Sequence, residues 1–121
     1  MEERRQFVRL DTRLEVSYAV LPSDKPKKSV TKNIGGGGVC LFTDKELPIG
    51  TRLQVAMKLP DQEVLVHFIA EVVWSEAYEV IGKTERQRAV ESGVRFVEIA
   101  PQDREAVMRH VILGFQLHAA P

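Results

Sequence analysis

Three arginines lie close together near the start of the chain, in the segment ERRQFVR at residues 3–9. Arg4, Arg5 and Arg9 carry permanent charges, and a guanidinium group can bind a phosphate or the O6/N7 edge of guanine through two parallel hydrogen bonds. A solvated, charged tail is the simpler interpretation of such a cluster on its own. A binding role therefore needs a second signal in the sequence.

The second signal is the run of four glycines in NIGGGG, residues 33–38. A two-residue hairpin turn needs only one or two glycines, so four indicate that the backbone comes close to another group there. Asn33 adds a compact amide and is a candidate for left-handed backbone. No Lys-Ser or Lys-Thr follows the run, and a strand rather than a helix comes next, which excludes a P-loop and a dinucleotide-binding motif. The residues expected to form a ligand surface are Gly35, Gly36, Gly37 and Gly38.

The residue types that commonly catalyse reactions have structural explanations here. Cys40, the one cysteine, lies in the apolar run VCLF and is expected to be a small buried hydrophobe without a disulfide partner. His67 lies between apolar positions of a strand and is expected to be partly buried and structural. His110 and His118 have no cysteine or carboxylate at the spacing of metal ligands. We therefore predict a protein that is not an enzyme and has no metal or cofactor.

Length and charge exclude several classes of protein. The 121 residues, 44% of them hydrophobic, correspond to one domain with a single core. The 17 basic side chains are balanced by 17 acidic ones, which argues against binding of a nucleic-acid polymer. No apolar run approaches the ~18 residues of a membrane span, and no apolar leader is present, so the expected compartment is the cytoplasm.

Apolar and polar residues alternate along most of the chain, as is typical of half-buried strands. The expected strands are 13–20, 30–34, 38–42, 51–59, 63–74 and two further segments within 78–99 that are joined by the loop 82–88. In the segment 63–74, Val64 and Trp74 fall on the same face as the central apolar residues, so Trp74 is expected in the core. Repeated short strands predict a small antiparallel barrel, since closure removes exposed strand edges.

A helical period replaces the alternation from Pro101 onward. Proline in the first turn, with acidic residues close behind it, favours a helix start at this point. We expect this helix to cover the barrel with one apolar face. The residues of that face are Val107, Met108, Val111, Ile112 and Phe115.

The two motifs, in this order, resemble those of PilZ domains. The Arg-x-x-x-Arg pattern falls on Arg5 and Arg9, with Arg4 in front of it, and NIGGGG is similar to the family's Asp/Asn-x-Ser-x-x-Gly segment. Asn33 and Gly38 match that segment, whereas Gly35 stands at the serine position. ESGVRF at 91–96 and the helix after it also resemble the end of the family's fold, so that the resemblance runs from about Glu3 to about Leu117.

The resemblance implies a mainly all-β fold, namely a six-stranded antiparallel PilZ-like β-barrel with a C-terminal α-helix. Residues 1–13 would form an arginine-rich switch segment, and residues 14–121 the barrel with its closing helix. The implied function is that of a bacterial receptor for the second messenger cyclic di-GMP (c-di-GMP), which signals to a separate partner protein. In similar proteins such partners act in motility, in exopolysaccharide production and biofilms, or in virulence.

The resemblance also implies roles for individual residues. Arg5 and Arg9 would contact phosphate and guanine, Arg4 would extend this clamp, and the glycine loop would be the surface against which it closes. The missing hydroxyl at Gly35 is expected to cost roughly 1 kcal/mol, a several-fold loss of affinity. The N-terminal segment is expected to be mobile in the free protein and ordered by the ligand.

Two other functions remain open at this point. One is a degenerate PilZ-like module that binds proteins and no longer binds the nucleotide. The other is a small barrel that binds single-stranded nucleic acid, which would require several exposed aromatic residues among basic ones, whereas Phe7 is the one aromatic beside the arginines. One or two ligand molecules per chain are both compatible with the sequence.

Overall fold

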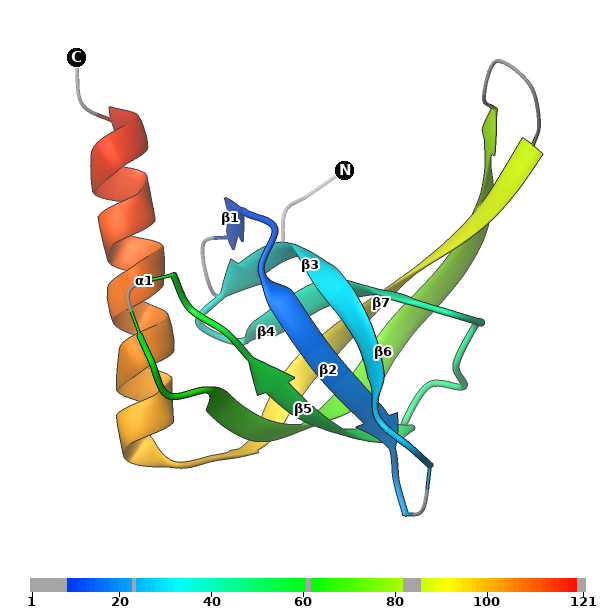
Figure 1. The fold of residues 1–121 in the computed structure, drawn as a ribbon, viewed down its shortest axis with the longest axis horizontal. Helices are drawn as coiled ribbons and strands as arrows, with labels where there is room; N and C mark the ends of the chain where they lie inside the picture. The colour runs from blue at the N-terminus through cyan, green and yellow to red at the C-terminus, as the bar shows by residue number, and fades with distance from the viewer. Residues whose placement is uncertain (1–8, 23, 61, 82–85, 120–121) are drawn as a thin grey trace.

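The computed structural model describes residues 9–22, 24–60, 62–81 and 86–119. Within these residues, seven strands are followed by one helix (Figure 1). The elements are β1 (Arg9–Asp11), β2 (Glu15–Val20), β3 (Lys27–Gly35), β4 (Gly38–Thr43), β5 (Arg52–Met57), β6 (Val66–Ile81), β7 (Arg86–Ile99) and α1 (Pro101–Ala119).

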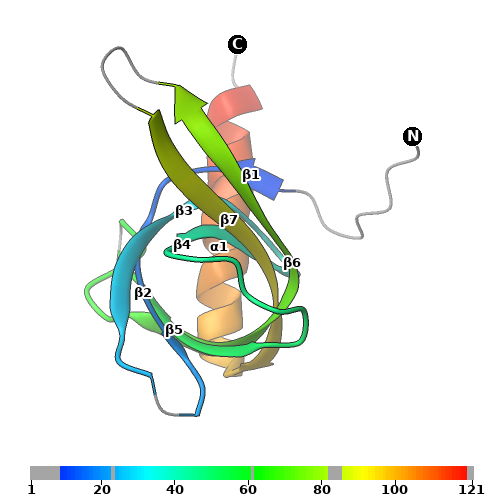
Figure 2. The ribbon, with the colours of Figure 1, turned by 90° about the vertical axis from the view of Figure 1, so that its right-hand side faces the viewer.

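Six of these strands form a closed antiparallel barrel in the order β3, β2, β5, β6, β7 and β4, and β4 pairs back with β3 (Figures 1 and 2). The short β1 pairs with the C-terminal part of β3, on the edge whose other part pairs with β2. The predicted six-stranded barrel with a C-terminal helix is therefore confirmed.

The interior of the barrel is one apolar core built by alternation along the strands. β2 contributes Val16 and Tyr18, and β5 contributes Leu53, Val55 and Met57, all of them buried. The polar residues between them face outward, as the period of two requires. The strands predicted at 13–20 and 51–59 are thus found with the expected inward faces.

Strands β6 and β7 are much longer than the barrel wall. The prediction of separate strands at 63–74 and after residue 78 is wrong, because β6 runs without interruption from Val66 to Ile81. The β4–β7 pairing ends at Thr43 and Val90, whereas the β6–β7 pairing continues to Ile81 and Arg86. Beyond β4 the two strands therefore form a two-stranded arm, which projects from the barrel in Figure 1.

Trp74 is not a core residue, contrary to the prediction. The β6–β7 register shifts between Val72 and Trp74, so a β-bulge changes which residues face inward. Val72 is fully buried, whereas Trp74 is 39% exposed and lies across Gly93, where any Cβ would overlap the indole ring. His67, on the outer face of β6, is exposed rather than partly buried as predicted.

Helix α1 stands beside the barrel and contacts β1, β3 and β6 (Figures 1 and 2). Its buried stripe includes Ala106, Val107 and Val111. Ile112 is 51% exposed, so its predicted place on the buried face is wrong. No helix among the described residues is long and apolar enough to cross a membrane.

Candidate functional site

Strand β1 brings the N-terminal arginine motif to the asparagine-glycine motif. Arg9 pairs with Gly35, Leu10 with Ile34, and Asp11 with Asn33. The Arg9 guanidinium donates a hydrogen bond from Nη1 to Asn33 Oδ1 at 2.9 Å, across 24 residues of sequence. The structure thus joins one residue of each predicted motif on the outer surface of the barrel, while Arg4 and Arg5 lie outside the described residues.

The next residue of β1 faces the opposite way and fixes the strand to the helix. Leu10 is 4% exposed, and its side chain lies so close to Gly114 of α1 that a Cβ there would overlap Leu10 Cδ2. Successive side chains of a strand point to opposite faces. Arg9 is therefore held at the candidate site by the packing of its neighbour against α1.

Asn33 has extended rather than left-handed backbone. It lies within β3 and pairs with Asp11 on one side and Cys40 on the other. No non-glycine residue in the described part of the chain has a positive φ, so the left-handed conformation considered for Asn33 is wrong. The extended backbone directs its amide away from Ile34, which is fully buried, and toward Arg9.

The glycine run forms the connection between β3 and β4. Gly35 ends β3 and Gly38 begins β4, with Ile34 and Val39 paired across the hairpin. The carbonyl of Gly37 accepts a hydrogen bond from Phe96 N at 3.0 Å. The main chain of β4 thus lies directly beside β7 at this end.

Gly38 is required by the fold itself. A Cβ at this position would overlap the carbonyl oxygen of Val94 and lie 2.9 Å from Arg95 Cα. The close approach that the glycine run predicted is therefore made, at this position, by the backbone of β7. A role for the other three glycines toward a ligand stays a prediction.

Two ion pairs flank the site, and the sequence pattern did not indicate them because their partners are far apart in the chain. Lys32 Nζ lies 2.9 Å from Glu91 Oε1, and this hydrogen bond raises the pKa of Lys32. Arg95 binds Glu71 Oε1 through Nε at 3.0 Å and Nη2 at 2.8 Å. The charges of Lys32 and Arg95 are thus compensated within the protein.

Cys40 has the surroundings of a core residue rather than those of a reactive thiol. Cys40 is 2% exposed, and burial raises its pKa to about 11, so the thiol is protonated at neutral pH. This agrees with the predicted buried hydrophobe. No group of three histidine, cysteine or acidic side chains that could hold a metal ion occurs in the described ranges.

The family of the chain follows from its sequence as a whole. A family model of the PilZ domain matches residues 3–113, and the chain belongs to this family. PilZ domains are a family of c-di-GMP receptors, and the resemblance seen in the two short motifs is confirmed at this level. No curated protein matches the chain.

Several solved structures have similar folds. The PilZ domain of YcgR from Escherichia coli with c-di-GMP matches with a TM-score of 0.74 and 18% identity, over 96% of this chain and 95% of that one. Inhibitor of motility (MotI/DgrA) from Bacillus subtilis gives 0.73 and 23%, over 99% and 55%. The MrkH–c-di-GMP complex from K. pneumonia gives 0.75 and 17%, over 98% and 54%. The chain thus spans about half the length of MotI and MrkH, and at these identities the likeness shows the fold.

Proposed function

We propose that the protein is a receptor for c-di-GMP that binds the ligand on the outer surface of the barrel, where β1 meets β3. The observation that carries this proposal is the hydrogen bond between Arg9 and Asn33, since it joins the two motifs that the family resemblance connects with the ligand. Membership of the PilZ family supports it, as do the neighbours YcgR and MrkH, whose structures contain c-di-GMP.

The chemistry of the site suits an anionic nucleotide. Asn33 orients the Arg9 guanidinium by accepting a hydrogen bond from one of the five N–H groups of that guanidinium. The planar guanidinium can bind a phosphate or the edge of guanine. Arg4 and Arg5 would add two further charges from the segment before β1. Gly35, Gly36 and Gly37 would let the ligand approach the main chain, without the serine hydroxyl that the family pattern has at position 35.

The N-terminal segment would act as the switch through which a partner protein recognises the bound state. Residues 9–11 of the proposed segment 1–13 pair with β3, so the gain of order on binding is expected in residues 4–8. Hydrogen exchange tests this point. The amides of residues 4–8 should become protected from exchange on adding c-di-GMP. The exchange of amides in the part of β6 that forms the barrel wall should change little.

Calorimetric titration with c-di-GMP tests the binding itself. Replacing Arg9 by alanine should weaken binding at least about tenfold, because each charge-assisted hydrogen bond contributes ~1.5–3 kcal/mol. The melting temperature of the free protein should barely change, since a partly exposed arginine contributes little to stability. Arg104→Ala, which removes an exposed arginine from α1, is the matched control and should bind like the wild type.

Two results would contradict the proposal in different ways. Absence of heat and of a thermal shift with wild-type protein at hundred-micromolar c-di-GMP would leave the degenerate, protein-binding module. Normal binding by the Arg9→Ala variant would instead place the ligand elsewhere on the barrel.

A further inference from the structure

A second surface lies on the outer side of the barrel, at the root of the β6–β7 arm. It is a shallow groove of about 580 Å³ that crosses β3, β4, β7 and β6. Its position is fixed by the cross-strand pair Tyr78–Ala89, which directly follows the last β4–β7 pair at Thr43 and Val90. Its lining residues are Arg13, Lys28, Ser29, Val30, Phe42, Tyr78 and Ala89.

Among the residues that the structure describes, two cations border this groove without an acidic partner. The Arg13 guanidinium lies over the ring of Phe42, with Cζ 5.8 Å from the ring centroid, in a cation–π contact. Both Arg13 and Lys28 are exposed. No ion pair to either of them occurs within residues 9–22, 24–60, 62–81 and 86–119.

Neighbouring cations differ from these two. Lys27 pairs with Asp44 at 2.9 Å and Arg88 with Glu46 at 3.1 Å. Lys32 pairs with Glu91, at 2.9 Å, between the groove and the Arg9–Asn33 site. The groove is therefore a local excess of positive charge on a chain whose net charge is zero.

The groove suits carboxylates better than a guanine base. The N–H edge of guanine needs hydrogen-bond acceptors, but the described lining residues offer no carboxylate or side-chain amide. The two hydroxyl groups in the lining of the groove already donate hydrogen bonds within the protein. Ser29 Oγ donates to the Phe42 carbonyl at 2.7 Å, and Tyr78 OH donates to Glu91 Oε1 at 3.0 Å. The polar groups that remain are the two cationic donors, and the floor between them is apolar.

We propose that this groove docks an acidic segment of a partner protein. Carboxylates of the segment pair with Arg13 and Lys28, and an apolar side chain between them lies on Phe42, Val30 and Ala89. Guanidinium groups match carboxylates bidentately, and the contact with Phe42 holds one face of the Arg13 fork while its N–H edge stays open. The surface does not depend on nucleotide binding at Arg9.

The probe is a fluorescein-labelled peptide in which two glutamates flank a phenylalanine, with one serine on each side of it, so that in an extended chain the three side chains share a face. Fluorescence polarisation at low salt should show saturable binding to the wild-type protein. Arg13→Glu and Lys28→Glu should each weaken binding about tenfold, because each removes an attraction and adds a repulsion. Lys25→Glu makes the same charge change at an exposed lysine outside the groove and should bind like the wild type.

Results of three kinds would overturn the proposal. The first is no binding of the acidic peptide to the wild type, or equal binding of a peptide with lysines in place of the glutamates. The second is an equal loss in Lys25→Glu, which would mean unspecific attraction. The third is displacement of the peptide by c-di-GMP, which would assign the groove to the nucleotide. Thermal melting verifies that each variant is folded. If Arg13→Glu does not fold, Lys28→Glu tests the proposal by itself.

Discussion

The two ends of β4 are held in opposite ways. At its start, Gly38 is packed by main chain against β7, next to the hydrogen bond from Arg9 to Asn33. At its end, Thr43 takes part in a chain of hydroxyl groups, of which Thr43 and Ser92 belong to buried residues. One end of the same strand thus relies on backbone contact and the other on side-chain hydrogen bonds.

The hydroxyl chain has a defined direction. Thr43 Oγ1 donates to the Lys45 carbonyl at 3.0 Å and must therefore accept from Ser92 Oγ at 2.9 Å. Ser92 then accepts from Ser75 Oγ at 2.8 Å, and Ser75 accepts from Leu47 N at 3.0 Å. Each hydroxyl both donates and accepts, so the chain ties β4, β6 and β7 to the loop after β4 with every proton used.

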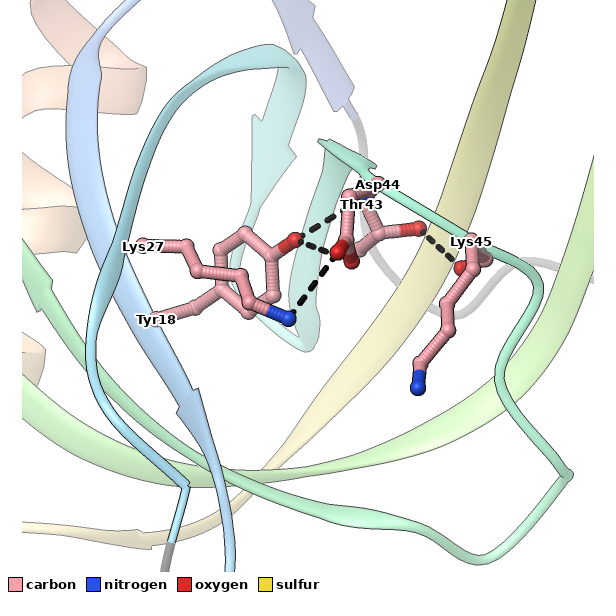
Figure 3. Close-up of polar contacts among 5 residues, drawn as sticks. All are labelled: Tyr18, Lys27, Thr43, Asp44 and Lys45. Atoms are coloured by element: carbon pink, nitrogen blue, oxygen red, sulfur yellow. Dashed lines mark hydrogen bonds and ion pairs between the residues drawn. The ribbon is translucent and has the colours of Figure 1, made fainter.

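A second network holds the same end (Figure 3). The Tyr18 hydroxyl donates to Asp44 Oδ1 at 3.1 Å and accepts from Asp44 N at 3.0 Å, and Lys27 Nζ lies 2.9 Å from Asp44 Oδ2. Burial raises the pKa of Tyr18, so its hydroxyl stays protonated and can donate. One rim of the barrel is thus held by side-chain hydrogen bonds, and the other by close packing of main chain.

Breaking the glycine end should have the largest effect. Gly38→Ala places a Cβ against the main chain of β7, which cannot rotate away, and should reduce the free energy of unfolding by about 3 kcal/mol or more. Gly50→Ala is the contrast, because it meets nothing within 4 Å and has only the strain of φ +94°. It should cost about 1 kcal/mol. Urea denaturation measures both, and equal costs would mean that β7 yields at Gly38.

Breaking the hydroxyl chain should have the next largest effect. Ser92→Ala leaves Thr43 without its donor and Ser75 without its acceptor in a buried place, and should cost about 2 kcal/mol. In a double-mutant cycle with Thr43→Val, the two losses should be clearly less than additive, since both break the same chain. Additive losses would contradict the coupled network.

A side chain at position 35 should change the affinity for the ligand rather than the stability of the fold. If position 35 is equivalent to the family's serine, Gly35→Ser should strengthen c-di-GMP binding several-fold, which corresponds to about 1 kcal/mol. Calorimetry on this variant and the wild type measures this. Unchanged or weaker binding by Gly35→Ser would mean that the loop is built around glycine.

The sequence predicted those parts of the fold that depend on local periodicity. Alternation located β2 and β5, and the change of period located α1 at Pro101. The prediction of Trp74 as a core residue was wrong, because a single bulged residue reverses the alternation and leaves no trace in composition. The prediction of Ile112 on the buried face was wrong because the period of a helix shows an apolar face but not the width of the stripe that the barrel covers.

The candidate site was predictable to the extent that it rests on motifs. Arg9 and Asn33 were selected from their types and order in the chain, and they are in contact. The pairs Lys32–Glu91 and Arg13–Phe42 were not predicted, because they depend on which strands become neighbours and in which register. Tyr18 was recognised only as an inward residue, since nothing in its surroundings in the sequence indicates Asp44.

The smallest expected effect concerns the ion pair at the fixed end of β4 and its dependence on pH. The hydrogen bond from Lys27, with a further one from Tyr18, lowers the pKa of Asp44 below its ordinary value. The unfolded chain therefore binds the proton more tightly than the folded one. The stabilisation is complete above the ordinary pKa of about 4 and is lost as the pH falls through the lower pKa of the folded state. Because the Asp44 side chain is 50% exposed, the contribution should stay below about 1 kcal/mol.

Asp44→Asn keeps an acceptor for Tyr18 and Lys27 but has no proton to gain. Urea denaturation should show the wild type more stable than Asp44→Asn at pH 6, with the difference disappearing toward pH 2.5. A difference that is the same at both pH values would mean that the carboxylate charge does not stabilise this end, and that the hydroxyl groups alone hold it.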